Sequence, residues 1–224
     1  MSVWAVLVAA GRGERLGQDR PKAFARLGDL PLLAEPLRRL DQSEWIDGVV
    51  VVAPPGWEEP AILLAEELGA SKVTACVAGG ATRSESVRLG LAEVPDDAVV
   101  VLVHDAARPF LPPEIVPRLL EALAEGYDAA VPALAVTDTV KRVRHGVVVE
   151  TPLREELVAV QTPQAFVASV FRAAAAGEGS DCASLVEAAG GRVKVVAGDE
   201  RLLKVTTPAD LERVSAWLTA EVAK

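Results

Sequence analysis

The sequence predicts an α/β fold, with a doubly wound, mainly parallel sheet between two layers of helices. Strand-like and helix-like segments alternate along the 224 residues. The first strand-like segments are near-continuous runs of valine, alanine and leucine, a pattern typical of strands buried on both faces. Half of the residues are hydrophobic, which is enough for a full core. Because no repeat or linker is visible, we expect residues 1–224 to form a single domain.

The expected elements follow one another as β-α-β units. The apolar runs expected as strands are Val3–Ala9, Val49–Ala53, Val73–Ala78, Val99–Val103, Ala129–Pro132, Leu157–Val160 and Val193–Val196. The segments expected as helices are Leu32–Leu40, Pro60–Leu68, Arg83–Glu93, Pro113–Glu125, Val167–Ala175, Cys182–Ala189 and Pro208–Ala220. Proline is tolerated in a first helical turn, which favours starts at Pro113 and Pro208. Thr207 is then the expected N-cap of the last helix, with Asp210 in its first turn.

One segment departs from this alternation. Residues 139–150 read Thr-Val-Lys-Arg-Val-Arg-His-Gly-Val-Val-Val-Glu. Apolar and polar residues alternate around His145-Gly146, which predicts a two-stranded hairpin. A lone hairpin has too little core to be stable by itself. We therefore expect it to lie against its own domain or against another subunit.

Composition excludes several classes of function. The net charge of −9 and the pI near 4.9 argue against a nucleic-acid partner. No apolar run approaches the roughly 20 residues of a membrane span, and Met1-Ser2-Val3 leads straight into a strand without a signal peptide. Cys76 and Cys182 lack metal-ligand spacing and are typical of thiols in a reducing cytosol. With only two histidines, a histidine-rich metal site is excluded. From the cysteines and the lack of a membrane span or signal peptide, we expect a cytoplasmic protein without a membrane partner.

The loop after the first strand indicates a polyanionic ligand. Glycines at Gly11 and Gly13 expose backbone N–H groups that can bind phosphate, and Arg15 and Lys22 add positive charge. The spacing of a P-loop does not occur here. The dinucleotide fingerprint fails because its third glycine is replaced by Leu16. A third class of phosphate loop remains.

Loops that follow other strands should lie at the same edge, because ligands of such sheets bind outside the carboxyl ends of strands. Asp105 follows the fourth strand and is well placed to hold Mg²⁺ beside phosphates. The alternative is that Asp105 caps the next turn and pairs with Arg108. We expect the neighbouring His104 to be structural.

Two further loops carry candidate ligands. Gly79-Gly80 would let the backbone approach a base or ribose, and Ser86 opens the following helix. The alternative is an ordinary strand-to-helix turn with a Ser or Thr cap. Near the end of the chain, Lys204 could reach a phosphate or could be a solvated surface lysine.

Taken together, these motifs resemble one family. Ala-Ala-Gly-x-Gly-x-Arg-Leu with a following Pro-Lys is the opening of the sugar-phosphate nucleotidyltransferases. Further motifs make the resemblance specific for the 2-C-methyl-D-erythritol 4-phosphate cytidylyltransferase family; they are Val-His-Asp-Ala-Ala-Arg-Pro, Gly-Gly-x-x-Arg-x-x-Ser-Val, Asp-Thr-Val-Lys, Thr-Pro-Gln-x-Phe and Lys-Val-Thr. The resemblance runs from about Val3 to Asp210. It implies a Rossmann-like fold of the nucleotide-diphospho-sugar transferase type.

The resemblance also implies a reaction. An oxygen of methylerythritol phosphate attacks the α-phosphorus of CTP, pyrophosphate leaves, and the product serves non-mevalonate isoprenoid synthesis. Catalysis in this family would be positioning and charge neutralisation, with Mg²⁺ as cofactor. That agrees with a sequence that offers cations, an aspartate and glycine loops.

The resemblance assigns roles to individual residues. Those implied to be catalytic are Arg15, Lys22 and Lys204, with Asp105 as the metal ligand. Those implied to bind the nucleotide are Ala9, Ala10, Gly11, Gly13, Gly80 and Ser86. Those implied to bind the acceptor are Arg108, Thr139 and Arg154. Arg154 would enter the site of a partner subunit, so that an arm at about 139–154 becomes the dimerisation arm of a homodimer.

Two positions depart from the family pattern, and three alternatives remain. Leu202 stands where asparagine is frequent, and Ala81 stands where some relatives have aspartate. A cytidylyltransferase for another polyol phosphate, such as ribitol 5-phosphate, would share the CTP loops. A guanylyltransferase and a non-catalytic nucleotide-sensing module are more distant alternatives.

Overall fold

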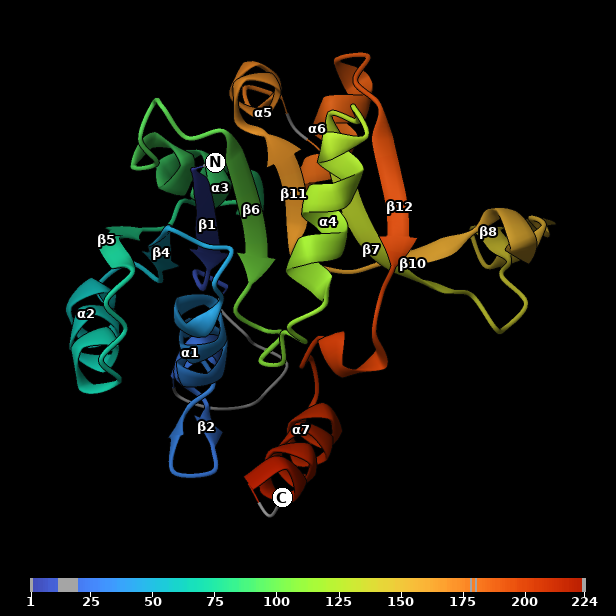
Figure 1. Cartoon of the computed structure of the whole chain (residues 1–224). Coiled ribbons are helices and arrows are strands. Elements are labelled where there is room, and N and C mark those ends of the chain that lie inside the picture. Colours follow the sequence, from blue (N-terminus) through green and yellow to red (C-terminus); the bar gives the residue numbers. More distant parts are fainter. Residues whose placement is uncertain (1, 12–19, 178, 180, 223–224) are drawn as a thin grey trace.

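A twisted sheet forms the centre of the molecule and separates two layers of helices (Figure 1). The structure is a computed structural model that describes residues 2–11, 20–177, 179 and 181–222. Seven strands of the large sheet are linked by hydrogen bonds, each to the next, in the order β10 (Val158–Val160), β7 (Ala129–Ala135), β11 (Gln164–Val167), β6 (Val100–Asp105), β1 (Val3–Val8), β4 (Gly48–Ala53) and β5 (Val73–Ala78). An eighth strand, β12 (Val193–Ala197), pairs with β7.

In the large sheet four of the seven described strand pairs are parallel, which confirms the predicted fold class. β1 pairs in parallel with both β4 and β6, and β12 runs parallel to β7. The antiparallel pairs involve β11 and β10. The register aligns Val8 of β1 with Val52 of β4 and with Asp105 of β6. The carboxyl ends of these parallel strands therefore meet at one edge, where the loops carrying the candidate residues begin.

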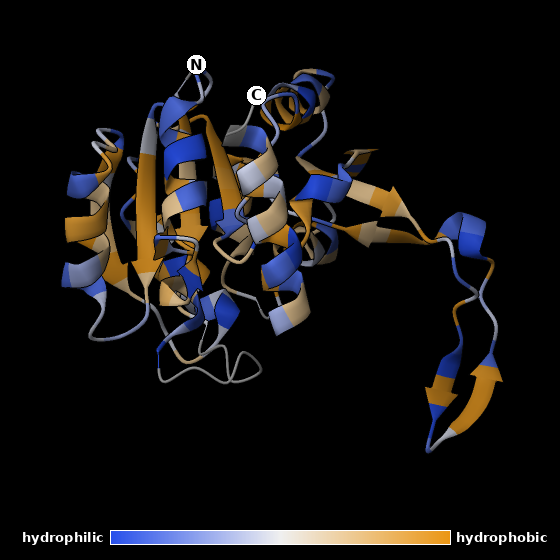
Figure 2. Ribbon diagram, turned by 90° about the horizontal axis from the view of Figure 1, so that it is seen from below, coloured by the Kyte–Doolittle hydropathy of each residue, from blue (hydrophilic) through white to orange (hydrophobic). Residues whose placement is uncertain are grey.

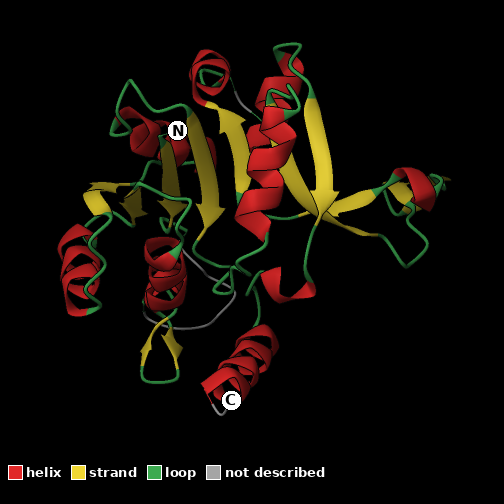
Figure 3. Cartoon of the chain, viewed as in Figure 1, coloured by secondary structure: helices red, strands yellow, loops and turns green. Residues whose placement is uncertain are grey.

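Helices cover both faces of the sheet (Figure 3). The helices on one face are α1 (Ala34–Gln42), α2 (Glu58–Glu67) and α4 (Ile115–Ala124). Those on the other face are α3 (Arg83–Ala92), α5 (Ala168–Ala174) and α6 (Cys182–Ala188). Successive residues of a strand point to opposite faces, so Ala5 and Leu7 pack in the first layer while Val6 packs in the second. This explains why the central strands are apolar throughout.

A third, smaller core forms beside the sheet. The short hairpin of β2 (Arg26–Leu27) and β3 (Leu30–Pro31) packs with the C-terminal helix α7 (Pro208–Val222). In this cluster the ring of Phe110 meets the ring of Trp217 edge-on at 5.8 Å between centroids. No helix among the described residues is both long enough and apolar enough to cross a membrane.

The sequence interpretation missed β11. We expected no strand between Leu157–Val160 and the helix from Val167, but Gln164–Val167 is a strand inserted between β6 and β7 and antiparallel to both. β10 and β11 lie along the same edge of β7, separated by Gln161, Thr162 and Pro163. The expected strand Val99–Val103 also continues further than predicted, because β6 includes both His104 and Asp105.

The predicted hairpin is present and projects away from the sheet (Figure 2). It consists of β8 (Arg142–Arg144) and β9 (Val147–Glu150), joined by His145 and Gly146, which both have positive φ. All residues of both strands are exposed. The apolar side chains of Val143, Val147 and Leu153 expose 51%, 66% and 65% of their surface. The described residues of this chain thus leave the hairpin without a covering core.

Candidate functional site

A cleft of about 260 Å³ opens at the carboxyl edge of the sheet. Its wall includes the end of β1, the turn after β5, the end of β6 and the segment after β12. The lining residues are Val8, Ala9, Ala10, Gly11, Lys22, Ala23, Gly80, Ala81, Thr82, Arg83, Ser86, Asp105, Ala106, Ala107 and Lys204. Loops distant in sequence therefore meet at one cavity, as the register of the parallel strands requires.

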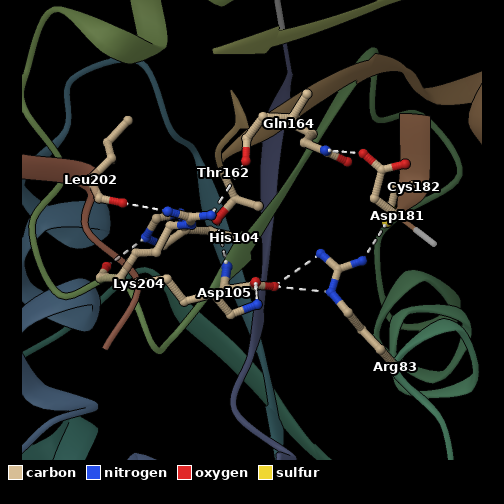
Figure 4. Close-up of polar contacts among 11 residues, drawn as sticks. Arg83, His104, Asp105, Thr162, Gln164, Asp181, Cys182, Leu202 and Lys204 are labelled. Carbon is tan, nitrogen blue, oxygen red and sulfur yellow. Dashed lines mark hydrogen bonds and ion pairs between the residues drawn. The ribbon is translucent and has the colours of Figure 1, made fainter. Parts of the chain in front are cut away.

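Asp105 is the charged centre of this cleft (Figure 4). Its Oδ1 accepts hydrogen bonds from Arg83 Nε at 3.0 Å and Nη2 at 2.9 Å. Its Oδ2 accepts one from Lys204 Nζ at 2.7 Å. Burial alone would raise the pKa of Asp105, but the two cations hold it well below its usual range. Asp105 is therefore an anion with a cation on each oxygen.

The backbone of Asp105 is fixed by a buried hydrogen-bond chain. Thr162 Oγ1 accepts from Asp105 N at 3.0 Å and lies 3.2 Å from His104 Nδ1, while His104 Nε2 lies 3.0 Å from the carbonyl oxygen of Arg108. Because that carbonyl can only accept, Nε2 carries the proton, and the Thr162 hydroxyl donates to Nδ1. Burial lowers the pKa of His104 to about 4. His104 is thus a neutral structural residue, in keeping with its expected role.

The turn after β5 places backbone groups of Gly80 and Ala81 at the cleft. The Oγ1 of Thr82 caps α3 by accepting from Glu85 N at 3.1 Å, and Glu85 Oε2 accepts from Ala81 N at 2.7 Å. Gly80 N donates to Ser86 Oγ at 3.1 Å. The alternative reading of this segment, a capped turn, is correct as local structure. The same turn nevertheless brings Gly80 and Ser86 to the cleft wall.

Arg108 lies outside the residues that line the cleft and braces the segment that carries Lys204. Its Nη1 donates to the carbonyl oxygen of Leu202, at the end of a 3₁₀ turn, Glu200–Leu202, and its Nη2 lies 3.5 Å from the carbonyl oxygen of Val160. Among the described residues, Arg108 does not form the alternative ion pair with Asp105. Arg83 and Lys204 pair with that carboxylate instead.

Comparison with known proteins shows which family the chain resembles. A sequence model described as IspD, 2-C-methyl-D-erythritol 4-phosphate cytidylyltransferase, matches residues 3–220. The chain belongs to this family. A cytidylyltransferase of the same name from Nocardia farcinica is 46% identical over 225 residues, which cover 99% of this chain and 96% of the relative. One from Rhodococcus jostii is 48% identical over 213 residues, covering 93% and 92%.

Solved structures agree with the assignment to the cytidylyltransferase family. The crystal structure of the Thermus thermophilus cytidylyltransferase superposes with a TM-score of 0.77 at 36% identity, covering 96% of this chain and 98% of that one. A 4-diphosphocytidyl-2C-methyl-D-erythritol synthase from Anaerococcus prevotii gives a TM-score of 0.83 at 27% identity, covering 97% and 98%. The doubly wound sheet described above is therefore the fold of the cytidylyltransferases.

Most of the residues expected at the site meet in the cleft. They are Ala9, Ala10, Gly11, Lys22, Gly80, Ser86, Asp105 and Lys204. Gly13 and Arg15 lie outside the described residues.

Two expected acceptor-binding residues lie on or beside the hairpin instead. Thr139 is exposed at the base of the hairpin. Arg154, in a 3₁₀ turn at Arg154–Glu156, donates from Nη1 to the carbonyl oxygen of Thr137 at 3.0 Å. Neither residue lines the cleft of its own chain.

Sequence reasoning missed Arg83 as a site residue. It appeared only as a letter of the Gly-Gly-x-x-Arg-x-x-Ser-Val motif, yet its guanidinium binds Asp105 and lines the cleft. Its position was nevertheless readable from the sequence. A helix that begins at the carboxyl edge of the sheet presents its first residue to the same cleft as the strand ends.

Proposed function

We propose that the chain transfers CMP from CTP to 2-C-methyl-D-erythritol 4-phosphate, giving 4-diphosphocytidyl-2-C-methyl-D-erythritol and pyrophosphate. The observation that carries this proposal is the convergence of Lys22, Arg83, Lys204 and Asp105 on one cleft in a chain of the cytidylyltransferase family. In the reaction a phosphate oxygen of the acceptor forms a bond to the α-phosphorus of CTP. The bond from that phosphorus to the bridging oxygen breaks, and pyrophosphate takes the electron pair.

Charge neutralisation and positioning suffice for such a step. Lys22 at the start of the 3₁₀ turn Lys22–Phe24 would stabilise the α-phosphate and the leaving group, together with Arg15. Lys204 would contact the α-phosphate from the other side of the cleft. Preorganised cations of this kind stabilise charge that develops in the transition state.

The nucleotide-binding residues offer mainly backbone and small side chains. Ala9, Ala10, Gly11 and Gly80 would surround cytosine and ribose, with the Ser86 hydroxyl nearby. We propose that this narrow wall favours a pyrimidine and rejects a purine by size. Because the reaction consumes CTP, we expect the enzyme to work in the cytoplasm. We also propose that the chain acts as one cytidylyltransferase domain.

The donor set of the cleft is compatible with Mg²⁺. This ion is commonly held by one or two carboxylates together with substrate phosphates and water. Asp105 lines the cleft. Among the described residues, its Oδ2 accepts one hydrogen bond, from Lys204, so this oxygen can still accept a further interaction. The described residues contain no cluster of three or more acidic, histidine or cysteine side chains that could hold a metal alone. When bound, Mg²⁺ would neutralise phosphate charge, with Asp105 as its protein ligand.

The hairpin gives a reason for a homodimer. Its exposed valines and Leu153 form an apolar surface that a second copy of the chain would cover. We propose that each arm then brings Arg154, and with it Thr139, to the acceptor end of the partner's cleft. Arg108 would remain beside the acceptor on its own chain.

Pyrophosphate release tests the proposed reaction. The purified chain is assayed with CTP and Mg²⁺ against methylerythritol phosphate, ribitol 5-phosphate and other polyol phosphates, and with GTP in place of CTP. We expect turnover with CTP and methylerythritol phosphate above all other pairs. Preference for ribitol phosphate would establish a different acceptor, preference for GTP a guanylyltransferase, and binding without turnover a nucleotide sensor.

A further inference from the structure

We infer that Arg83 is a positioning residue that keeps Asp105 paired while Lys204 moves from this carboxylate to a substrate phosphate. The inference rests on the proposed function, because it concerns how the cleft accepts a triphosphate. Arg83 belongs to the Gly-Gly-x-x-Arg-x-x-Ser-Val motif, but the family resemblance implied no role for it.

Arg83 is held firmly in place. Two of its nitrogens bind the same oxygen of Asp105, and its third, Nη1, donates to Cys182 Sγ at 3.4 Å (Figure 4). It is the first residue of α3, directly after the cap residue Thr82. Cys182 is buried at the start of α6, and burial raises the pKa of its thiol to about 11. The neutral thiol is thus a fixed acceptor behind the guanidinium.

Lys204 is held less firmly on the opposite side of Asp105. Among the described residues, the recorded hydrogen bond of its ammonium group is the one to Oδ2 of Asp105. Its side chain is 42% exposed, compared with 30% for Arg83. A flexible four-carbon stem and a single recorded contact allow the ammonium to swing toward a new anion, whereas a planar guanidinium with three anchored nitrogens stays in place.

The unequal anchoring has an energetic consequence. The Asp105 side chain is only 9% exposed, and removing the partner of a buried carboxylate leaves an uncompensated charge, which is strongly unfavourable. With Arg83 in place, departure of Lys204 leaves Asp105 still paired. Without Arg83, Lys204 would be the only cation that the described part of the chain places on this carboxylate, and it would bind Asp105 more tightly. Arg83 therefore lowers the barrier to moving the Lys204 ammonium from Asp105 to a substrate phosphate.

Kinetics on matched variants test this role. We expect Arg83→Gln to lower kcat at least tenfold while the KM for CTP changes less than threefold, because the ground-state cleft keeps its shape. Arg83→Lys should recover part of the loss, since it restores the positive charge but not the hydrogen bonds from two nitrogens to Oδ1 of Asp105. Arg88→Gln is the control, because Arg88 is on the same helix but outside the cleft lining and contacts the carbonyl oxygen of Gly177. It should leave kcat unchanged.

A second background separates action through Asp105 from a general loss. In Asp105→Asn protein there is no carboxylate that must stay paired when Lys204 leaves, so adding Arg83→Gln should lower kcat less than threefold further. An equal fold-loss in both backgrounds would overturn the inference.

A measurement independent of turnover separates this inference from the proposed reaction. The nucleotide-free protein is treated with trace acetic anhydride, and acetylation of Lys204 is followed by mass spectrometry against the exposed Lys141. Because Arg83→Gln tightens the Asp105–Lys204 pair, it should slow acetylation of Lys204 severalfold. Unchanged or faster acetylation would contradict the inference even in an active enzyme. If wild-type protein releases no pyrophosphate, the proposed reaction fails but the acetylation result still decides the role of Arg83.

Melting temperatures of all variants exclude unfolding as the cause. If Arg83→Gln melts below the assay temperature, Arg83→Lys carries the same tests, with smaller changes in the same direction. No change in either kcat or acetylation for Arg83→Lys would then overturn the inference.

Discussion

Single residues decide how closely the loops of the cleft can approach one another. A Cβ at Gly79 would lie 2.2 Å from the Cβ of Ala10 and 3.3 Å from the carbonyl oxygen of Ala53. Neither neighbour is the end of a flexible side chain, so backbone would have to move. At Gly11, in contrast, no heavy atom of the described residues other than its chain neighbours lies within 4 Å of the Cβ position. The loop after β1 and the turn after β5 therefore touch at Gly79.

We expect Gly79→Ala to force these two loops apart. Overpacking of this kind costs about 1–3 kcal/mol, so the melting temperature should fall by several degrees, and the Kd for CTP should rise because the cleft wall is displaced. Calorimetric titration with CTP and thermal unfolding measure both effects. Gly11→Ala is the steric control and should leave the melting temperature unchanged. A Gly79→Ala protein with wild-type stability and CTP affinity would mean that the loops adjust without cost.

At the same scale, sequence motifs predicted most of the cleft but not its internal pairing. Lys22, Gly80, Asp105 and Lys204 were expected there because each follows a strand or a Gly-rich turn, and chain topology alone gathers such positions. The partner of Asp105 was not predictable in the same way. Arg108 is three residues away in sequence, whereas Arg83 is 22 residues away and reaches Asp105 only through the packing of α3.

The C-terminal helix α7 is stabilised by hydrogen bonds where it begins. Thr207 Oγ1 accepts from Asp210 N at 3.2 Å, and Asp210 Oδ2 accepts from the backbone N–H groups of Thr206 and Thr207 at 2.9 and 2.8 Å. Burial alone would raise the pKa of Asp210, but the hydrogen bonds from Thr206 and Thr207 lower it to about 2. The predicted cap of the last helix is thus confirmed as a reciprocal capping box.

We expect Asp210→Asn to destabilise the protein by about 1 kcal/mol at neutral pH, since it removes the charge that accepts these bonds and faces the helix N-terminus. The pKa of the folded state is lowered, so the stabilisation is present above the usual aspartate pKa and is lost as the pH falls from about 4 toward about 2. Denaturant unfolding at pH 7, 4 and 3 measures the difference between variant and wild type. Glu212→Gln, two residues further along the same helix, is the control. A difference that stays constant with pH would rule out the charge as its source.

The success of prediction also differed from element to element. The central strands β1, β4 and β6 were readable because burial on both faces makes them continuously apolar, and α7 because its start carries a cap and a proline. β11 was not readable. It has four residues, follows Pro163, and is a strand only because β6 and β7 supply partners on both sides. Short strands of this kind are determined by tertiary pairing, which local pattern does not contain.

The whole molecule has one feature that its own core does not explain, the projecting hairpin (Figure 2). Its strands are held together by their own ladder and by an ion pair at 2.8 Å between Arg142 and Glu150, while their apolar side chains stay exposed. An isolated two-stranded hairpin is marginally stable in water. The arm is therefore expected to be fully ordered when a partner chain covers it.

A mixing experiment tests whether two chains share each site. Lys22→Ala disables the cleft and Arg154→Ala disables the arm, so each homodimer should lose most turnover. In a mixed dimer, one site combines an intact cleft with an intact arm. Random exchange should restore about a quarter of the wild-type sites, because half of the dimers are mixed and half of their sites are intact. Pyrophosphate release is measured after native mass spectrometry has verified the mixed dimers. Lack of recovery in verified mixed dimers would argue that each chain completes its own site.

The position of Thr162 links the hairpin to Asp105. The chain returns from the hairpin through β10, and two residues after Val160 the Thr162 hydroxyl accepts the hydrogen bond from Asp105 N. The segment that returns from the hairpin therefore also supports the edge of the sheet at which Asp105 lies. Length variation among relatives should accumulate at the tip of the hairpin, at His145-Gly146, where added residues disturb nothing behind them. Between β10 and β11 an inserted residue would shift the register of the strand that supports Asp105, so this stretch tolerates the least change in length.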